Sequence, residues 1–116
     1  MKQQARVHTE KLLEKLNEID AIYKQTRQQG EQADFYAVIE PFASEVQQLS
    51  TEWKQMIEVI VAESPTYFIG ERQVDTVVDN ICKLSVQAYY ASTSLNRFKS
   101  YIQSTRFTLN SILRQL

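Results

Sequence analysis

The side chains that most often carry catalysis or bind metals are scarce in this chain. His8 is the only histidine and Cys82 the only cysteine, so no disulfide can form within the chain. A di-iron site in a helical bundle needs two Glu-x-x-His pairs, but Ala5 stands three residues before the single histidine. A Cys–His nucleophilic pair could come only from Cys82 and His8, and we interpret them instead as a small core residue and a residue at the core boundary. We therefore expect no catalytic, metal or cofactor site, and a protein that is not an enzyme.

The charged residues are divided unevenly along the chain. Residues 1–79 carry all 14 acidic residues and eight of the 13 basic ones, a net charge of −6. Residues 80–116 carry five basic residues and no acidic one, a net charge of +5. Either the last helix lies against acidic neighbours and the charges select that pairing, or it presents a face that binds an anion. An isoelectric point near 5.8 argues against a dedicated nucleic-acid-binding domain, which is usually basic overall.

Aromatic and basic residues toward the C-terminus form a candidate interaction surface. At about 100° per residue, Phe107 falls nearly opposite the apolar face of the last helix. It either touches a neighbouring loop or helix, or forms a binding hot spot with the arginines around it, because aromatic and Arg residues are enriched at such sites. The candidate surface consists of Val86, Tyr90, Lys99, Arg106, Phe107 and Arg114.

Asn80 and Gln87 are two amides seven residues apart that flank the apolar face of the third predicted helix. Polar groups at a helix contact can form a hydrogen-bonded pair that determines the register of the helices. The alternative is that the two amides belong to a site for a small ligand.

Long helices must position these residues, and residues 35–60 carry the clearest helical pattern. Their large apolar side chains are spaced alternately four and three residues apart, as in a helix that other helices cover on one side. A strand, with its period of two, cannot produce this spacing. Trp53 is therefore predicted to lie in the core. The pattern comprises Phe35, Ile39, Phe42, Val46, Leu49, Trp53, Met56 and Ile60.

Three further stretches repeat this spacing, which predicts an all-α fold: an up-down-up-down four-helix bundle that forms one domain over residues 1–116. The predicted helices span residues 2–28, 34–63, 71–94 and 96–115. Pro41 removes a backbone hydrogen bond and clashes with the preceding turn, so the second helix is either kinked or split there. Ser64 precedes Pro65 and is biased out of the helical region, which ends that helix. Three apolar residues of the next connection, Tyr67, Phe68 and Ile69, are expected to pack over one end of the core.

The composition favours a soluble location. Hydrophobic residues make up 43% of the chain and charged residues 23%, which is ordinary for a soluble globular protein. No window approaches about 18 consecutive apolar residues, and residues 1–10 lack the apolar core of a signal peptide. We expect neither membrane insertion nor export, and hence a cytoplasmic protein.

Several short motifs along the chain occur in an order and spacing that can be compared with known families. They are Asp34-Phe35-Tyr36, Pro41, Trp53, Pro65-Thr66-Tyr67, Asp79-Asn80, Gln87 with Tyr89, and Arg97-Phe98-Lys99. By their order and spacing, roughly residues 30–112 resemble the YppE-like family of small proteins from low-GC Gram-positive bacteria. The resemblance implies a four-helix bundle. It implies no activity or site residue, because the function of that family is unknown.

A non-catalytic protein–protein interaction or adaptor module accounts best for these features. It would self-associate or bind one protein partner through a helical face, because apolar and aromatic residues remain outside the four core faces. The alternative is binding of nucleic acid or another polyanion through the basic C-terminal helix, which a steep loss of affinity with rising salt would reveal. Binding of a small molecule within the bundle is a third possibility.

Overall fold

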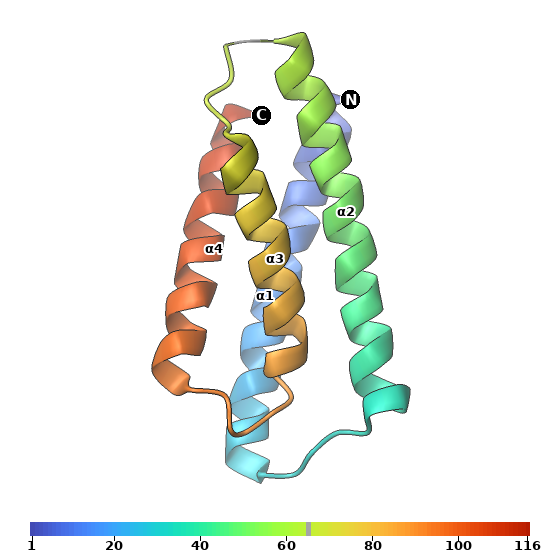
Figure 1. Cartoon of the computed structure of the whole chain (residues 1–116), viewed down its shortest axis with the longest axis vertical. Coiled ribbons are helices and arrows are strands. Elements are labelled where there is room, and N and C mark those ends of the chain that lie inside the picture. The colour runs from blue at the N-terminus through green and yellow to red at the C-terminus, as the bar shows by residue number, and fades with distance from the viewer. Residues whose placement is uncertain (65) are drawn as a thin grey trace.

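Four long helices make up the computed structural model, which describes residues 1–64 and 66–116. They are α1 (Lys2–Gln29), α2 (Glu40–Glu63), α3 (Glu71–Gln87) and α4 (Leu95–Gln115), and a π-helical turn, η1 (Phe35–Ile39), directly precedes α2. Successive helices run in opposite directions along a bundle 47 Å long (Figure 1). Each helix packs against the next, and α4 returns to pack against α1. The predicted all-α four-helix fold is confirmed. Pro65, in the connection between α2 and α3, lies outside the described residues.

The helix ends follow local rules. Gly30 ends α1 in the left-handed conformation, with φ 69°, and its N–H donates to the Thr26 carbonyl. Ser64 ends α2 with φ −139° and ψ 105°, the extended conformation favoured before a proline. Ser94 precedes α4, and its hydroxyl oxygen accepts a hydrogen bond from the Arg97 N–H (3.4 Å).

Pro41 lies in the first turn of α2, immediately after the π turn. The Ile39 N–H donates to the Asp34 carbonyl (3.2 Å), and the Glu40 N–H donates to the Phe35 carbonyl, both five residues back. Pro41 has no N–H with which to extend this pattern, but a helix tolerates proline in its first turn. A kink and a split were both open from the sequence. The structure has instead a change of helix type, from π to α, with no gap between the two.

The buried face of α2 differs in part from the predicted one. Phe35 was predicted to begin the core pattern, but its side chain is 44% exposed because the π turn packs chiefly against α2 itself, at the end of the bundle. Ser50 and Ile57 are buried, whereas Leu49 and Met56 are only half-buried. The buried face of α2 is therefore turned toward α3, where the Ser50 hydroxyl oxygen lies 3.6 Å from the Cys82 Sγ.

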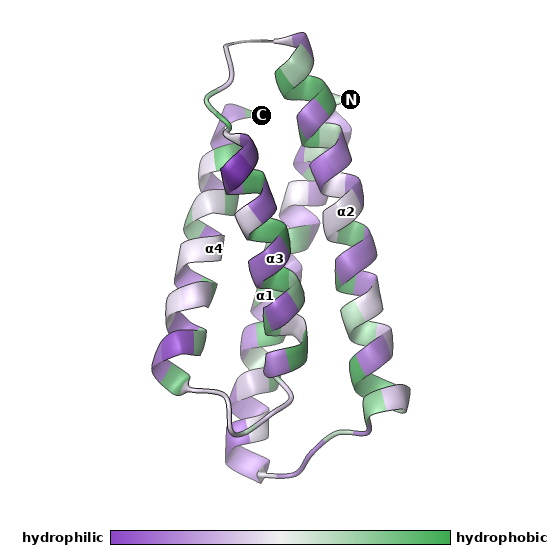
Figure 2. Ribbon diagram, in the orientation of Figure 1, coloured by the Kyte–Doolittle hydropathy of each residue, from purple (hydrophilic) through white to green (hydrophobic). Residues whose placement is uncertain are grey.

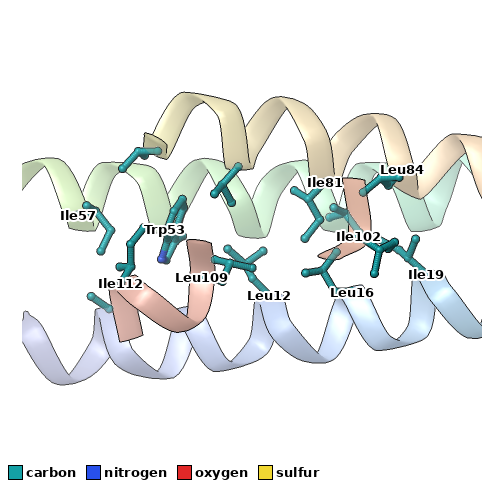
Figure 3. Packing of buried hydrophobic residues seen from close by; sticks show 14 of the residues in the cluster. Leu12, Leu16, Ile19, Trp53, Ile57, Ile81, Leu84, Ile102, Leu109 and Ile112 are labelled. Carbon is teal, nitrogen blue, oxygen red and sulfur yellow. The ribbon is translucent and has the colours of Figure 1, made fainter. Parts of the chain in front are cut away.

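Apolar side chains from all four helices form one core. Hydrophobic and hydrophilic residues alternate along every helix, as amphipathic helices require (Figure 2). Trp53 is completely buried, as predicted, among Leu12, Leu109 and Ile112 (Figure 3). Its indole N–H donates to the Thr9 hydroxyl oxygen (2.8 Å), and the Thr9 hydroxyl donates to the Ala5 carbonyl (2.7 Å). This buried chain of hydrogen bonds joins α2 to α1.

Two buried threonines allow a matched test of that chain of hydrogen bonds. Thr9→Val leaves the Trp53 N–H without its acceptor and is expected to lower the free energy of unfolding by about 1–3 kcal/mol. The Thr105 hydroxyl is also buried but has no hydrogen-bond partner among the described residues. Thr105→Val should therefore leave the stability unchanged or raise it by about 1 kcal/mol. Urea denaturation measures both, and an equal loss in the two variants would show that the indole hydrogen bond does not stabilise the fold.

The third helix was predicted to run to residue 94, which is wrong. It ends at Gln87, and residues 88–94 form a turn in which the Tyr90 N–H bonds to the Gln87 carbonyl, three residues back. The Thr93 hydroxyl also donates to the Gln87 carbonyl (2.8 Å). The hydroxyl of Tyr23, a buried residue of α1, donates to the Thr93 carbonyl. This contact with a helix 70 residues away in sequence favours a turn where the local pattern alone would continue the helix.

Candidate functional site

The basic residues of α4 are not paired with the acidic helices. Ion pairs join α1 to α2 through Lys15 and Glu45 (2.6 Å), and α2 to α3 through Lys54 and Asp75 (2.7 Å). Within residues 1–64 and 66–116, none involves a basic residue of α4. The described residues thus contain no ion pair that would select the packing partner of α4, and both interpretations of the charge asymmetry stay predictions. Apolar packing and hydrogen bonds to uncharged groups hold α4 in place.

Arg106 illustrates such a hydrogen bond. Its guanidinium donates to the Asn17 Oδ1 of α1 (3.1 Å), so this half-buried side chain is turned toward α1. In the opposite direction, the Arg6 guanidinium of α1 donates to the Leu113 carbonyl near the end of α4 (3.4 Å). Arg106 is therefore a packing contact between helices as well as a surface charge.

The six residues of the predicted interaction surface do not form one patch. Phe107 is 70% exposed, and Arg114 lies about two turns farther along α4. Lys99 is exposed, whereas Val86 and Tyr90 are half-buried at the end of α3 and in the turn that follows. The length of α4, about 30 Å, separates Tyr90 from Arg114. Phe107 is an exposed aromatic residue that lies along α4 between these two ends.

Phe68 is a more exposed aromatic residue, which the sequence analysis assigned to the core end. Ile69 is buried and Tyr67 half-buried, as expected, but Phe68 is 88% exposed. The side-chain amide of Gln115 holds its backbone: the Phe68 N–H donates to Gln115 Oε1 (2.8 Å), and Gln115 Nε2 donates to the Phe68 carbonyl (3.3 Å). The prediction failed because three adjacent apolar residues in a connection cannot all face the core.

An apolar groove lies next to this connection, between α2 and α3. Its volume is about 300 Å³. The ion-paired residues Lys54 and Asp75 also line it. Its apolar lining consists of Ile57, Val61, Ala62, Ile69 and Val74.

A second, polar groove lies between α3, α4 and the turn that joins them. Its volume is about 480 Å³. Asn80 and Gln87 both line it, and in the part of the chain that the structure describes neither amide side chain is hydrogen-bonded to another helix. This observation favours the ligand-site interpretation of the two amides over the register pair. The full lining is Asn80, Lys83, Leu84, Gln87, Ser92, Thr93, Ser94, Arg97 and Tyr101.

The single cysteine and the single histidine are packed separately. Cys82 is half-buried beside Ser50, and burial raises the pKa of its thiol, so the unreactive protonated form dominates at neutral pH. The His8 Nε2 lies 3.3 Å from the Glu52 Oε2, and its Nδ1 lies 3.1 Å from the Gln4 carbonyl. No hydrogen bond joins the two residues, so they do not form a nucleophilic pair.

Residues 1–64 and 66–116 contain neither a metal-binding cluster nor a membrane-spanning helix. No group of three or more His, Cys, Asp and Glu side chains there could hold a metal ion. No helix in these residues is both long and apolar enough to cross a membrane.

The fold and its surfaces define a small antiparallel four-helix bundle with exposed aromatic side chains, an apolar groove and a polar groove. The chain belongs to the family described as "Bacterial domain of unknown function (DUF1798)", which it matches over residues 9–116. Over 105 residues it is 27% identical to the Uncharacterized protein YppE of Bacillus subtilis (strain 168), a match that covers 90% of this chain and 85% of YppE. The resemblance to the YppE-like family is confirmed.

Solved structures share this fold. The crystal structure of YppE from Bacillus subtilis matches with a TM-score of 0.91 at 22% identity, over 98% of this chain and 93% of that one. A Listeria innocua protein of unknown function matches with a TM-score of 0.90 at 23% identity, over 98% of this chain and 94% of the other. These similarities establish the fold alone.

Proposed function

We propose that this protein is a non-catalytic interaction module that acts in the cytoplasm and associates with a second copy of itself. The observation that supports this most directly is the exposed ring of Phe68 on a backbone that Gln115 holds at both the N–H and the carbonyl. A backbone that is already held in place loses little conformational freedom on binding, which favours association. Aromatic anchors of this kind dominate the energy of many interfaces.

The apolar groove between α2 and α3 supports a second copy as the partner. Ile69 lines this groove and follows Phe68 directly in sequence, so the anchor and the groove lie at the same end of the bundle surface. A two-fold axis near this surface would place the Phe68 ring of each copy in the groove of the other. A symmetric dimer requires such a self-complementary surface.

The proposed dimer is weak. One aromatic anchor and one groove on each copy make a small contact, whereas a stable interface buries about 1,600 Å² in total. We therefore expect an equilibrium between monomer and dimer that depends on concentration.

Sedimentation velocity up to about 1 mM protein tests the proposal, because a dissociation constant of 1 mM corresponds to only about 4 kcal/mol. Wild-type protein should dimerise in this range and Phe68→Ser should stay monomeric. Phe107→Ser is the matched control, since it removes another exposed phenylalanine, and it should dimerise like the wild type.

A complementation experiment sharpens the test. Ala62→Arg fills the groove and keeps Phe68, whereas Phe68→Ser keeps the groove. Each variant alone should be monomeric, and an equimolar mixture should recover part of the association through one intact contact. A wild type that remains monomeric contradicts self-association. Dissociation by Phe107→Ser but not by Phe68→Ser would place the interface on α4 instead.

A further inference from the structure

The polar groove between α3 and α4 has the features of a binding site that self-association does not use. It lies where the end of α3, the connecting turn and the start of α4 come together (Figure 1). Its volume of about 480 Å³ lies within the range of small-molecule sites.

The groove contains two basic side chains that form no ion pair in the described residues. Lys83 comes from α3 and Arg97 from α4, and both line it. No acidic side chain is part of the lining, and no ion pair within the described residues includes Lys83 or Arg97. The absence of acidic residues follows from the sequence, because the whole lining comes from residues 80–116, which carry no acidic residue. A concave site of one sign concentrates ligands of the opposite charge.

Uncharged donors surround the two cations. The amides of Asn80 and Gln87 come from one wall of the groove, and Ser92 and Ser94 come from the turn. Tyr101, whose side chain is 45% exposed, adds a partly apolar wall. Amides, hydroxyls and a guanidinium together suit the oxygens of a phosphate group, since Arg binds such oxygens through two parallel hydrogen bonds.

The turn that forms one wall is held in place before any ligand binds. The Thr93 hydroxyl bonds to the end of α3, and its carbonyl accepts the Tyr23 hydroxyl of α1. The first turn of α4 carries no acidic residue, so its positive dipole end is not neutralised there. A wall that does not need to be ordered on binding lowers the cost of binding.

We propose that this groove binds a small molecule through its phosphate group. Arg97 and Lys83 contact the phosphate oxygens, the amides of Asn80 and Gln87 contact polar groups beside it, and the Tyr101 ring packs against the remainder of the ligand.

A titration followed by ¹H–¹⁵N NMR tests the site with two probes, inorganic phosphate and phenyl phosphate, against sodium chloride at matched ionic strength. Shifts beyond those caused by chloride should concentrate on residues 92–97 and on the side-chain amides of Asn80 and Gln87. Tighter binding of phenyl phosphate identifies an organic phosphate as the ligand class, whereas equal affinity identifies free phosphate and removes the role proposed for Tyr101.

Substitutions of the basic residues test which side chains contribute to the affinity for phosphate. Replacing both Lys83 and Arg97 by Gln should weaken phosphate binding by about tenfold or more, because charge-assisted hydrogen bonds are the stronger ones. Lys99→Gln is the matched control, since it removes an exposed charge of α4 outside the groove lining, and it should change the dissociation constant by less than about twofold. Both groove residues are exposed, so the variant spectrum should remain that of the folded bundle. Equal weakening by Lys99→Gln, or shifts no larger than those with chloride, would overturn the proposal in favour of general attraction to a basic helix.

Discussion

Trp53→Ala is expected to lower the free energy of unfolding by about 3–5 kcal/mol, a large part of the 5–15 kcal/mol available to a small domain. The indole is completely buried between α2, α1 and α4, so its removal leaves a cavity that the surrounding side chains cannot fill. The substitution also removes the indole N–H that donates a hydrogen bond to the Thr9 hydroxyl oxygen. Urea denaturation followed by circular dichroism measures the change.

The control for Trp53→Ala is Tyr36→Ala, at an aromatic residue that is 80% exposed in the π turn. Its effect should stay within about 0.5 kcal/mol, as for most surface substitutions. In the wild type, Trp53 fluorescence should be blue-shifted and resist quenching by iodide. A tryptophan that iodide quenches freely in the folded protein would contradict the placement of Trp53 in the core.

Tyr23→Ala should destabilise the opposite end of the bundle by a similar amount, about 3–5 kcal/mol. The Tyr23 ring is buried and stacks on Phe98 of α4, with the ring centroids 3.9 Å apart. Its hydroxyl bonds to the Thr93 carbonyl and accepts a hydrogen bond from Arg27 (3.2 Å). The substitution therefore removes both an aromatic contact between α1 and α4 and the support of the α3–α4 turn.

Tyr23→Phe separates these two contributions, because it keeps the ring and removes the hydroxyl. It should cost about 0.5–1.5 kcal/mol, the usual net value of one hydrogen bond. Amide hydrogen exchange should become faster at residues 89–93 in this variant and remain unchanged in the centre of α2. A loss in Tyr23→Phe as large as that in Tyr23→Ala would show that the stacking contributes little. No change in exchange would show that Tyr23 does not hold the turn.

The sequence determined the helices because helical spacing is a local property. Alternate steps of four and three residues place apolar side chains on one side of any helix, whatever packs against it. The same argument predicted the burial of Trp53 and Ile60, and the extended conformation of Ser64 followed from the proline after it. Residues at the edge of the apolar face were less predictable. Ile57 is buried and Met56 only half-buried because the neighbours of α2 decide how it is rotated.

Tertiary contacts decided everything that depends on two distant segments. The third helix ends at Gln87 where Tyr23, from another helix, bonds to Thr93, and no pattern within residues 71–94 contains that contact. The backbone of the exposed Phe68 is held by Gln115, 47 residues away. The polar groove combines Asn80 and Gln87, which the sequence singled out, with Ser92 and Tyr101, which it did not. Amphipathic patterns specify which side of a helix faces inward, but not its axial position beside another helix, and this position determines which side chains meet in a groove.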